Sequence, residues 1–137
     1  MNASGTKPWI SVVILAGVVY FVVGRVFALP SGNVKLWRLA AWVVSGAVYA
    51  AQISYEHFRL HHRPRVTAQH AALAVALGAF FLAVAATVHA LTAVSHAPYW
   101  RYLLAFVLWP IVTAVPAFLI ALTAAAILER WNTRHSY

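Results

Sequence analysis

The sequence contains no cysteine and very little charge. Without cysteine, the chain has no disulfides, no thiolate metal sites and no cysteine nucleophile. Only 9% of its 137 residues are charged, and only Glu56 and Glu129 are acidic, whereas an average soluble chain is about 25% charged. With this little charge, the chain cannot form a water-exposed surface over its whole length. The sequence therefore excludes an ordinary soluble domain.

Glycine is also scarce, and the arrangements that support common enzyme chemistry are missing. The six glycines are dispersed and form neither a phosphate-binding loop nor a dinucleotide fingerprint. No nucleophile, base and orienting group occur at a plausible spacing, so we expect the protein not to be an enzyme. The net charge of +8 comes from basic residues at the ends of apolar segments rather than from a basic run, so nucleic acid is not an expected partner.

The chain is instead rich in long apolar segments. Hydrophobic residues make up 64% of it, and about 20 apolar residues suffice to cross a bilayer. Four such windows fill the sequence, approximately residues 9–29, 36–55, 68–91 and 102–128. The sequence therefore predicts an all-α integral membrane protein, a single membrane domain over residues 1–137, with four transmembrane helices in an antiparallel bundle. The first window is longer than the apolar region of a signal peptide, so we expect an uncleaved span.

The distribution of basic residues predicts the orientation of the spans. An even number of spans places both termini on one side of the membrane. That side would hold Lys7, Arg59, Arg63, Arg65, Arg130 and Arg134. The opposite side would hold Arg25, Lys35, Arg38 and Arg101. The positive-inside rule then favours cytoplasmic termini, and the alanine-rich composition favours a bacterial inner (plasma) membrane.

Alanines recur at helical spacing in the third and fourth windows. In the third window they stand at Ala72, Ala76, Ala79, Ala83, Ala86 and Ala90. In the fourth they stand at Ala114, Ala117, Ala121 and Ala124. Because small side chains let helix backbones approach closely in a bilayer, these stripes predict a tight antiparallel pair of helices.

The second window carries a polar face formed by Ser45, Tyr49, Gln52 and Glu56. Polar groups do not face lipid cheaply, so this face should form hydrogen bonds to other helices or to a partner protein. Tyr20 of the first window lies at a similar expected depth and is the natural first partner. The alternative is a hydrated path or a small polar ligand site along the same face.

Histidines near the end of the second window form a candidate metal site. His57 and His61 are four residues apart and share a helical face if the helix continues past the membrane. Together with Glu56, and with His70 as a further candidate, they suit Zn, Fe, Cu or Ni. The alternative is that neighbouring arginines oppose a cation and the histidines contact lipid headgroups.

Two short motifs resemble elements of known cofactor-binding families. The spacing of His57, His61 and His62 resembles one H-x3-HH box of the membrane fatty-acid desaturases and hydroxylases. Those enzymes use several boxes to hold two irons, and the sequence has no second box. The segment from Ala85 to His89 resembles the A-x-x-x-H element of light-harvesting antenna polypeptides, which implies tetrapyrrole ligation by His89.

Three functions fit these features. The first is an interaction or assembly role, as an accessory subunit of a larger membrane complex, with the lipid bilayer and a protein partner or a second copy as its contacts. The second is an oligomeric small transporter or channel with a polar path along the second helix. The third is a redox, metal-binding or tetrapyrrole-binding membrane protein, although no particular cofactor is predicted.

Overall fold

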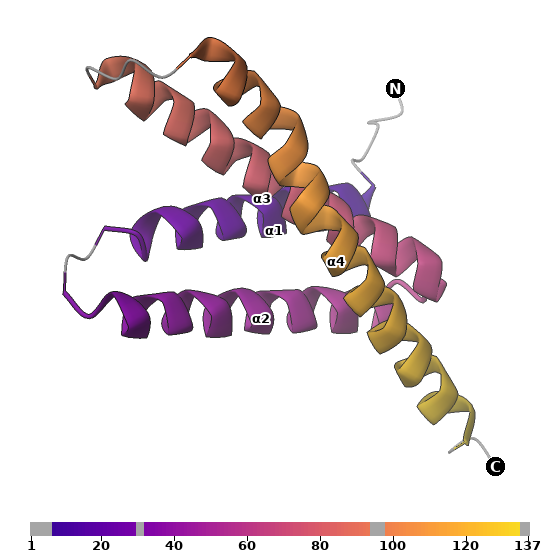
Figure 1. Cartoon of the computed structure of the whole chain (residues 1–137). Helices are drawn as coiled ribbons and strands as arrows, with labels where there is room; N and C mark the ends of the chain where they lie inside the picture. Colours follow the sequence, from indigo (N-terminus) through magenta and orange to yellow (C-terminus); the bar gives the residue numbers. More distant parts are fainter. Residues whose placement is uncertain (1–6, 30–31, 94–97, 135–137) are drawn as a thin grey trace, which may run out of the picture.

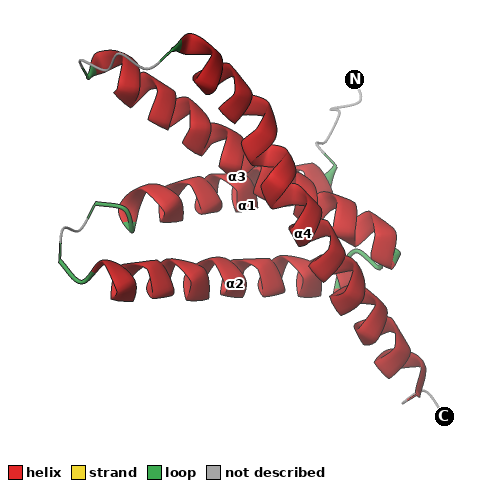
Figure 2. Cartoon of the chain, in the orientation of Figure 1, coloured by secondary structure: helices red, strands yellow, loops and turns green. Residues whose placement is uncertain are grey.

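The computed structural model describes residues 7–29, 32–93 and 98–134, without the side chains of Tyr99 and Arg134. This part of the chain forms four α-helices and no strand (Figures 1 and 2). They are α1 (Pro8–Val26), α2 (Val34–Phe58), α3 (Pro64–Thr92) and α4 (Tyr99–Arg134). The all-α class predicted from the sequence is confirmed.

Local sequence accounts for where three of the helices begin. Proline occupies the first helical position of both α1 and α3, where its missing N–H needs no partner and its fixed φ suits the helix. Before α2, the side chain of Asn33 accepts a hydrogen bond from the backbone N–H of Leu36 at 3.4 Å, which caps the helix. Helices α2, α3 and α4 extend beyond their predicted apolar windows at both ends, whereas α1 begins one residue earlier than predicted and ends at Val26, three residues earlier than predicted.

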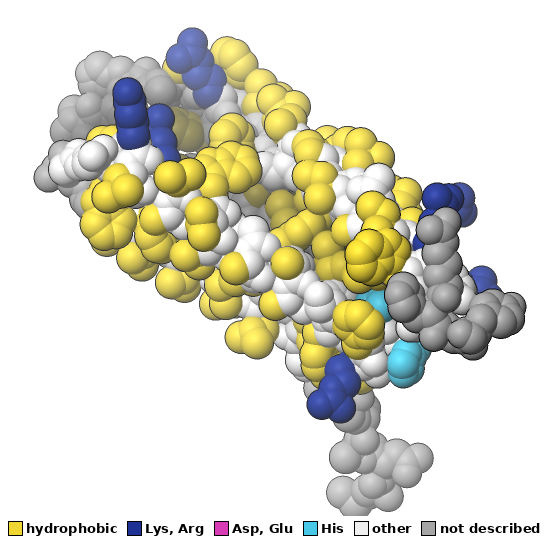
Figure 3. All heavy atoms as spheres, turned by 90° about the horizontal axis from the view of Figure 1, so that it is seen from below, with side chains coloured by type: hydrophobic (Ala, Val, Ile, Leu, Met, Phe, Trp, Pro, Cys, Tyr) yellow, Lys and Arg dark blue, Asp and Glu magenta, His cyan; other side chains and the backbone are white. Residues whose placement is uncertain are grey.

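Three of the four helices are long and apolar enough to cross a membrane. These are α1, α3 and residues Trp100–Thr133 of α4. The remaining helix, α2, is less apolar because it carries Lys35, Arg38, Gln52 and Glu56. Hydrophobic side chains cover the middle of the molecule, and basic side chains gather towards its ends (Figure 3). A surface of this kind suits contact with lipid.

Helix α3 is the centre of the packing. Its contact with α4 is the most extensive in the structure, its contact with α1 comes next, and α2 is packed more loosely. Successive helices run in opposite directions (Figure 1). The start of α1, the α2–α3 connection and the end of α4 therefore lie towards one end of the molecule, which we call the 56–70 end.

The alanines of α3 are buried on more faces than the predicted stripe. Of the predicted set, Ala79, Ala83, Ala117 and Ala121 are buried. Ala72, Ala76, Ala90, Ala114 and Ala124 are half-buried, and Ala86 is exposed. Ala68, Ala71 and Ala74, which lie outside that stripe, are fully buried. A single stripe underestimates the buried surface because α3 contacts all three other helices.

Glycines allow α1 and α3 to approach each other closely. A Cβ atom at Gly78 of α3 would lie 2.7 Å from Cβ of Tyr20 and 3.1 Å from the carbonyl oxygen of Gly17. On α1, a Cβ atom at Gly17 would lie 2.8 Å from a methyl group of Leu77. This contact follows the small-residue rule of membrane helices, but here the small residues are glycines that the alanine pattern does not include.

Candidate functional site

The candidate site is built around the carboxylate of Glu56, which is fully buried. Glu56 lies in the last turn of α2, on the polar face predicted from the sequence. One turn earlier, Nε2 of Gln52 donates to Oε1 of Glu56 at 3.4 Å. Farther along the face, the hydroxyl of Tyr49 donates to the carbonyl of Ala117 on α4, and Ser45 is half-buried. The polar face of α2 is therefore directed at the other helices.

Two histidines from other segments converge on the same carboxylate oxygen. Nδ1 of His70, on α3, lies 2.7 Å from Oε2 of Glu56. Nδ1 of His62, in the α2–α3 connection, lies 3.3 Å from the same atom. With Gln52, the carboxylate of Glu56 has three hydrogen-bond partners, which offset the large cost of burying a charged group.

The short connection between α2 and α3 explains why His62 takes part. Helix α2 ends at Phe58, and His61 has a φ of 50°, the left-handed region that reverses the chain direction. The backbone N–H of His62 then donates to the carbonyl of Glu56 at 3.4 Å. The turn therefore places His62 beside Glu56, in the last turn of α2.

This turn corrects one expectation about the metal site. His57 and His61 share a helical face only if α2 continues past His61, and the helix stops at Phe58. Among the described residues, the group whose ligand atoms converge is Glu56, His62 and His70, with these atoms within 4.8 Å of one another. His57 and His61 instead line a hollow of ≈ 230 Å³ beside Glu129 and the end of α4, and His62 borders this hollow as well.

Aromatic packing encloses the site on the side of α1. The indole ring of Trp9 lies parallel to the ring of His70, with an interplanar angle of 1° and centroids 4.5 Å apart. The rings of His62 and His70 meet edge to face at 5.2 Å. His70 is 8% exposed, so Trp9 and the surrounding helices hold its ring in one orientation.

Unpaired buried oxygens lie on both helices that form the site. Among the described residues, Oε1 of Gln52 and Oγ1 of Thr67 are buried without a hydrogen-bond partner. Gln52 also donates to Glu56, so its amide is already next to the carboxylate. Because buried polar atoms are almost always hydrogen-bonded, Oε1 of Gln52 is an additional oxygen available to a ligand or water near the site.

Two other residues predicted from sequence lie outside this cluster. Tyr20 was expected to bond the polar face of α2, but its hydroxyl is buried without a partner among the described residues. Tyr49 bonds to α4 instead. His89 is exposed in the last turn of α3, about five turns from His70, so it lies at the opposite end of this helix.

From the sequence alone, His62 belonged only to the desaturase-like motif and not to the candidate metal site. In the sequence, His62 stands six residues after Glu56, the acid at the end of the polar face. Recognising it requires knowing that α2 ends between them, because six residues along a continuous helix place two side chains on different faces.

The fold and the site together define an all-α protein with three membrane-length apolar helices and a Glu–His–His cluster in which Glu56 and His70 are buried and His62 is half-buried. Comparison of the chain with protein-family models, with curated proteins and with solved structures finds no match. The protein is therefore characterised by its apolar helices and by the cluster of Glu56, His62 and His70.

Proposed function

We propose that the protein is a four-span integral membrane protein that binds a transition-metal ion through Glu56, His62 and His70. The observation that carries this proposal is the convergence of their three ligand atoms within 4.8 Å. The donors come from α2, the α2–α3 connection and α3. Two histidines and one carboxylate form the ligand set of many zinc sites and of non-haem iron sites that keep open positions.

The present distances suit a metal after a small rearrangement. With bonds of about 2.0–2.1 Å, neighbouring ligands of a tetrahedral ion lie about 3.3 Å apart. The Nδ1 atom of His62 already lies 3.3 Å from Oε2 of Glu56, and that of His70 lies at 2.7 Å. A metal would therefore require Nδ1 of His70 to move about 0.6 Å away from Oε2 of Glu56. The ligand nitrogens of the two histidines, which lie within 4.8 Å of each other, would also have to approach to about 3.3 Å.

Electrostatics also support a cation at this position. A fully buried carboxylate at the end of an apolar helix bundle is costly, even when it is hydrogen-bonded. A divalent ion would take the place of the hydrogen bonds between the two imidazoles and Glu56 and would neutralise the carboxylate directly. Gln52 would continue to hold the other carboxylate oxygen, Oε1 of Glu56, through its Nε2 donor.

We propose that α2 also crosses the membrane, with both termini in the cytoplasm. Its 25 residues span about 37 Å, which exceeds the roughly 30 Å of the hydrocarbon core. Its charged Lys35 and Arg38 lie within the first five residues of the helix, and Gln52 and Glu56 are buried against other helices. With the arginine-rich 56–70 end facing the cytoplasm of a bacterial cell, the metal site would lie near the inner surface of the inner membrane.

Metal analysis of the purified protein tests the metal proposal. We expect about one ion per chain after equilibration with Zn²⁺ or, in a separate sample, with Co²⁺. The Co²⁺ sample should show the visible absorption of a tetrahedral site. Glu56→Gln, His62→Ala and His70→Ala should each remove most of this binding. His57→Ala and His61→Ala are matched controls that should keep it. No stoichiometric metal in the wild-type protein, or unchanged Co²⁺ absorption in the three site variants, would rule the proposal out.

An accessory-subunit role is the second candidate, and the outward face of α2 favours it. Gly46, Ala47 and Ala50 are exposed there, and a Cβ atom at Gly46 would meet no described atom within 4 Å. Trp42, one turn before Gly46, is 79% exposed. The Gly46-x-x-x-Ala50 spacing is the small-residue pattern by which membrane helices associate.

Gentle solubilisation from native membranes tests this role. A stoichiometric partner that is lost on Gly46→Leu but kept on the exposed lipid-facing variant Val115→Leu would support it. Isolation of the chain alone, under conditions that keep known complexes intact, would contradict it. The transport alternative is less favoured, because Gln52 and Glu56 are buried and the hydroxyl of Tyr49 is engaged with α4.

A further inference from the structure

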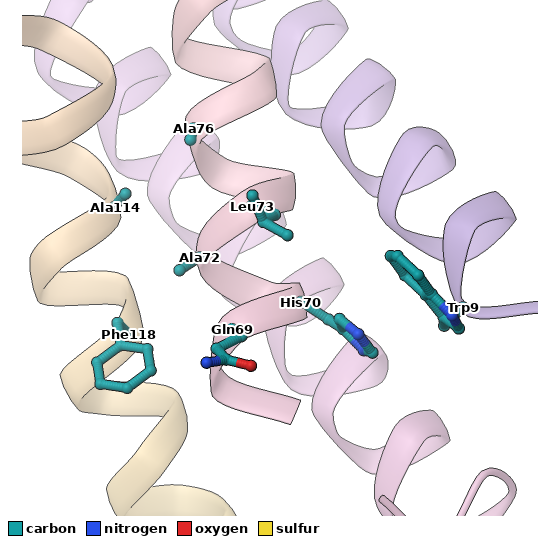
Figure 4. Close-up of a pocket in the computed structure, with 8 residues that line it drawn as sticks. All are labelled: Trp9, Gln69, His70, Ala72, Leu73, Ala76, Ala114 and Phe118. Carbon is teal, nitrogen blue, oxygen red and sulfur yellow. The ribbon is translucent and has the colours of Figure 1, made fainter. Parts of the chain in front are cut away.

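A hollow of ≈ 490 Å³ lies over α3 between α1 and α4. Its walls include Trp9 on α1, Gln69, Ala72 and Ala76 on α3, and Ala114 and Phe118 on α4. Figure 4 shows Trp9 on one side, Ala114 and Phe118 on the other, and the small alanine side chains between them. The volume falls within the range of about 300–1,000 Å³ that is usual for ligand pockets. We call this hollow the alanine groove.

The alanine groove is polar at one end and apolar along the rest of its length. Gln69 and His70 lie near the start of α3, at the 56–70 end of the molecule. Ala72 and Ala76 follow on α3, one and two turns farther towards its middle. The groove runs along α1, α3 and α4, the three helices that are apolar enough to cross a membrane. A ligand with a polar head and an apolar tail matches this order.

Positive charge stands at the polar end of the groove. Lys7 directly precedes α1, two residues before Trp9, and it is exposed. Arg65 is the second residue of α3 and is also exposed. It stands four residues before Gln69 and therefore on the same face of α3. The stacking of Trp9 on His70 brings the starts of α1 and α3 to the same end.

The backbone adds to this positive potential. Neither α1 nor α3 has a side-chain cap on its first turn or an acidic residue within it. Within these first turns, the N–H groups and the positive ends of the two helix dipoles are therefore not offset by a capping or acidic side chain. Phosphate groups are commonly bound at helix starts of this kind.

We propose that the alanine groove binds one anionic phospholipid. Its acyl chain lies on Ala72, Ala76 and Ala114, and its phosphate lies at the starts of α1 and α3 beside Lys7 and Arg65. The proposal depends on the membrane location of the chain and not on the metal, although His70 borders both sites. Charge complementarity selects a phospholipid with net negative charge over a zwitterionic one, with roughly a fivefold preference for each cation near the headgroup.

Lipid titration of delipidated protein in a non-ionic detergent tests the proposal. Phosphatidylglycerol and phosphatidylcholine with the same acyl chains are compared by native mass spectrometry and by thermal stabilisation. For the wild-type chain we expect one retained phosphatidylglycerol and a preference of roughly 25-fold over phosphatidylcholine. The double variant Lys7→Gln/Arg65→Gln should lose this preference and remain folded, because both positions are exposed.

Two further variants separate the groove from non-specific lipid contact. Lys35→Gln/Arg38→Gln removes two exposed cations at the start of α2, at the other end of the molecule, and should leave the preference unchanged. Ala76→Leu narrows the groove and should weaken the binding of both phosphatidylglycerol and phosphatidylcholine. Equal binding of the two lipids by the wild-type chain would overturn the proposal, as would full preference in the Lys7/Arg65 variant. The proposal would also fail if Ala76→Leu abolished self-association of the chain and left lipid binding unchanged. The groove would then hold a helix of a second copy.

Discussion

The ring of Trp9 lies flat against the ring of His70, with their centroids 4.5 Å apart. Nδ1 of the same histidine lies 2.7 Å from the buried carboxylate of Glu56. One imidazole therefore connects α1, α2 and α3. The Glu–His–His cluster depends on this meeting of three helices, and the stability of that region can be tested at each partner.

Replacement of Trp9 should loosen the start of α1. An aromatic pair contributes about 0.5–1.5 kcal/mol beyond its buried area. We expect Trp9→Ala to lower the free energy of unfolding by about 1 kcal/mol through the lost stack, in addition to the loss of buried area. Trp9→Phe should keep most of the stacking contribution, because a phenyl ring can still lie on His70. Unfolding in mixed SDS micelles measures the change, with the highly exposed Trp42→Ala as the control. Equal losses for the two alanine variants would contradict a specific stack.

The two histidines of the site should differ in their contribution to stability. Hydrogen bonds to charged groups contribute about 1.5–3 kcal/mol. His70 is the closer and more buried partner of Glu56, and the side chain of His62 is 26% exposed. We therefore expect His70→Leu to destabilise the protein more than His62→Leu in metal-free detergent solution. The reverse order in thermal unfolding would argue against the observed geometry.

The contact of α1 with α3 requires glycine at position 78. A methyl group there would lie 2.7 Å from Cβ of Tyr20, so the helices would have to separate. We expect Gly78→Ala to cost about 1–3 kcal/mol, the usual range for overpacking. Gly46→Ala is the matched control, because a Cβ there meets no described atom within 4 Å. The prediction fails if both variants melt at the wild-type temperature.

The alanine stripe of α3 offers a second packing test. Ala79 and Ala83 are 5% and 6% exposed, respectively, whereas Ala86 is exposed. We expect Ala79→Leu/Ala83→Leu to lower the thermal stability in detergent by at least the equivalent of about 2 kcal/mol. Ala86→Leu should change it little. Unchanged stability of the double variant would show that these positions tolerate larger side chains and do not require close packing.

The absence of cysteine makes the proposed topology directly testable. Single cysteines can be introduced at Gly32, in the α1–α2 connection, and at Leu60, in the α2–α3 connection, without any background thiol. With four spans and cytoplasmic termini, Gly32→Cys should react with a membrane-impermeant maleimide on intact cells. Leu60→Cys should react only after the cells are opened. Reaction of both positions on intact cells would show that α2 does not cross the membrane.

Much of the fold follows from the spacing of apolar residues. The four helices coincide with the four apolar windows, because a run of about 20 apolar residues has few alternatives to a helix in lipid. Helix ends were less predictable. Phe58 ends α2 within a polar stretch, and Pro64, which begins α3, indicates a break in this region without fixing the residue at which α2 ends.

The candidate site was only half accessible to sequence analysis. Glu56 and the inward direction of its helical face follow from helical periodicity, since Gln52 and Tyr49 lie on the same side. The choice of histidines does not follow from it. His57 and His61 have the attractive spacing, whereas His62 and His70 reach Glu56 because a five-residue connection folds the chain back on itself.

By itself, the sequence determined the all-α class, the apolar helices and the scarcity of charge, because these depend on composition and on the 3.6-residue period of the helix. Only the tertiary structure decided which histidines meet the buried acid and that glycines join α1 to α3. It also decided that alanines leave a groove between α1 and α4. Those relationships depend on where a turn falls and on how closely helices pack, which contacts between distant residues determine.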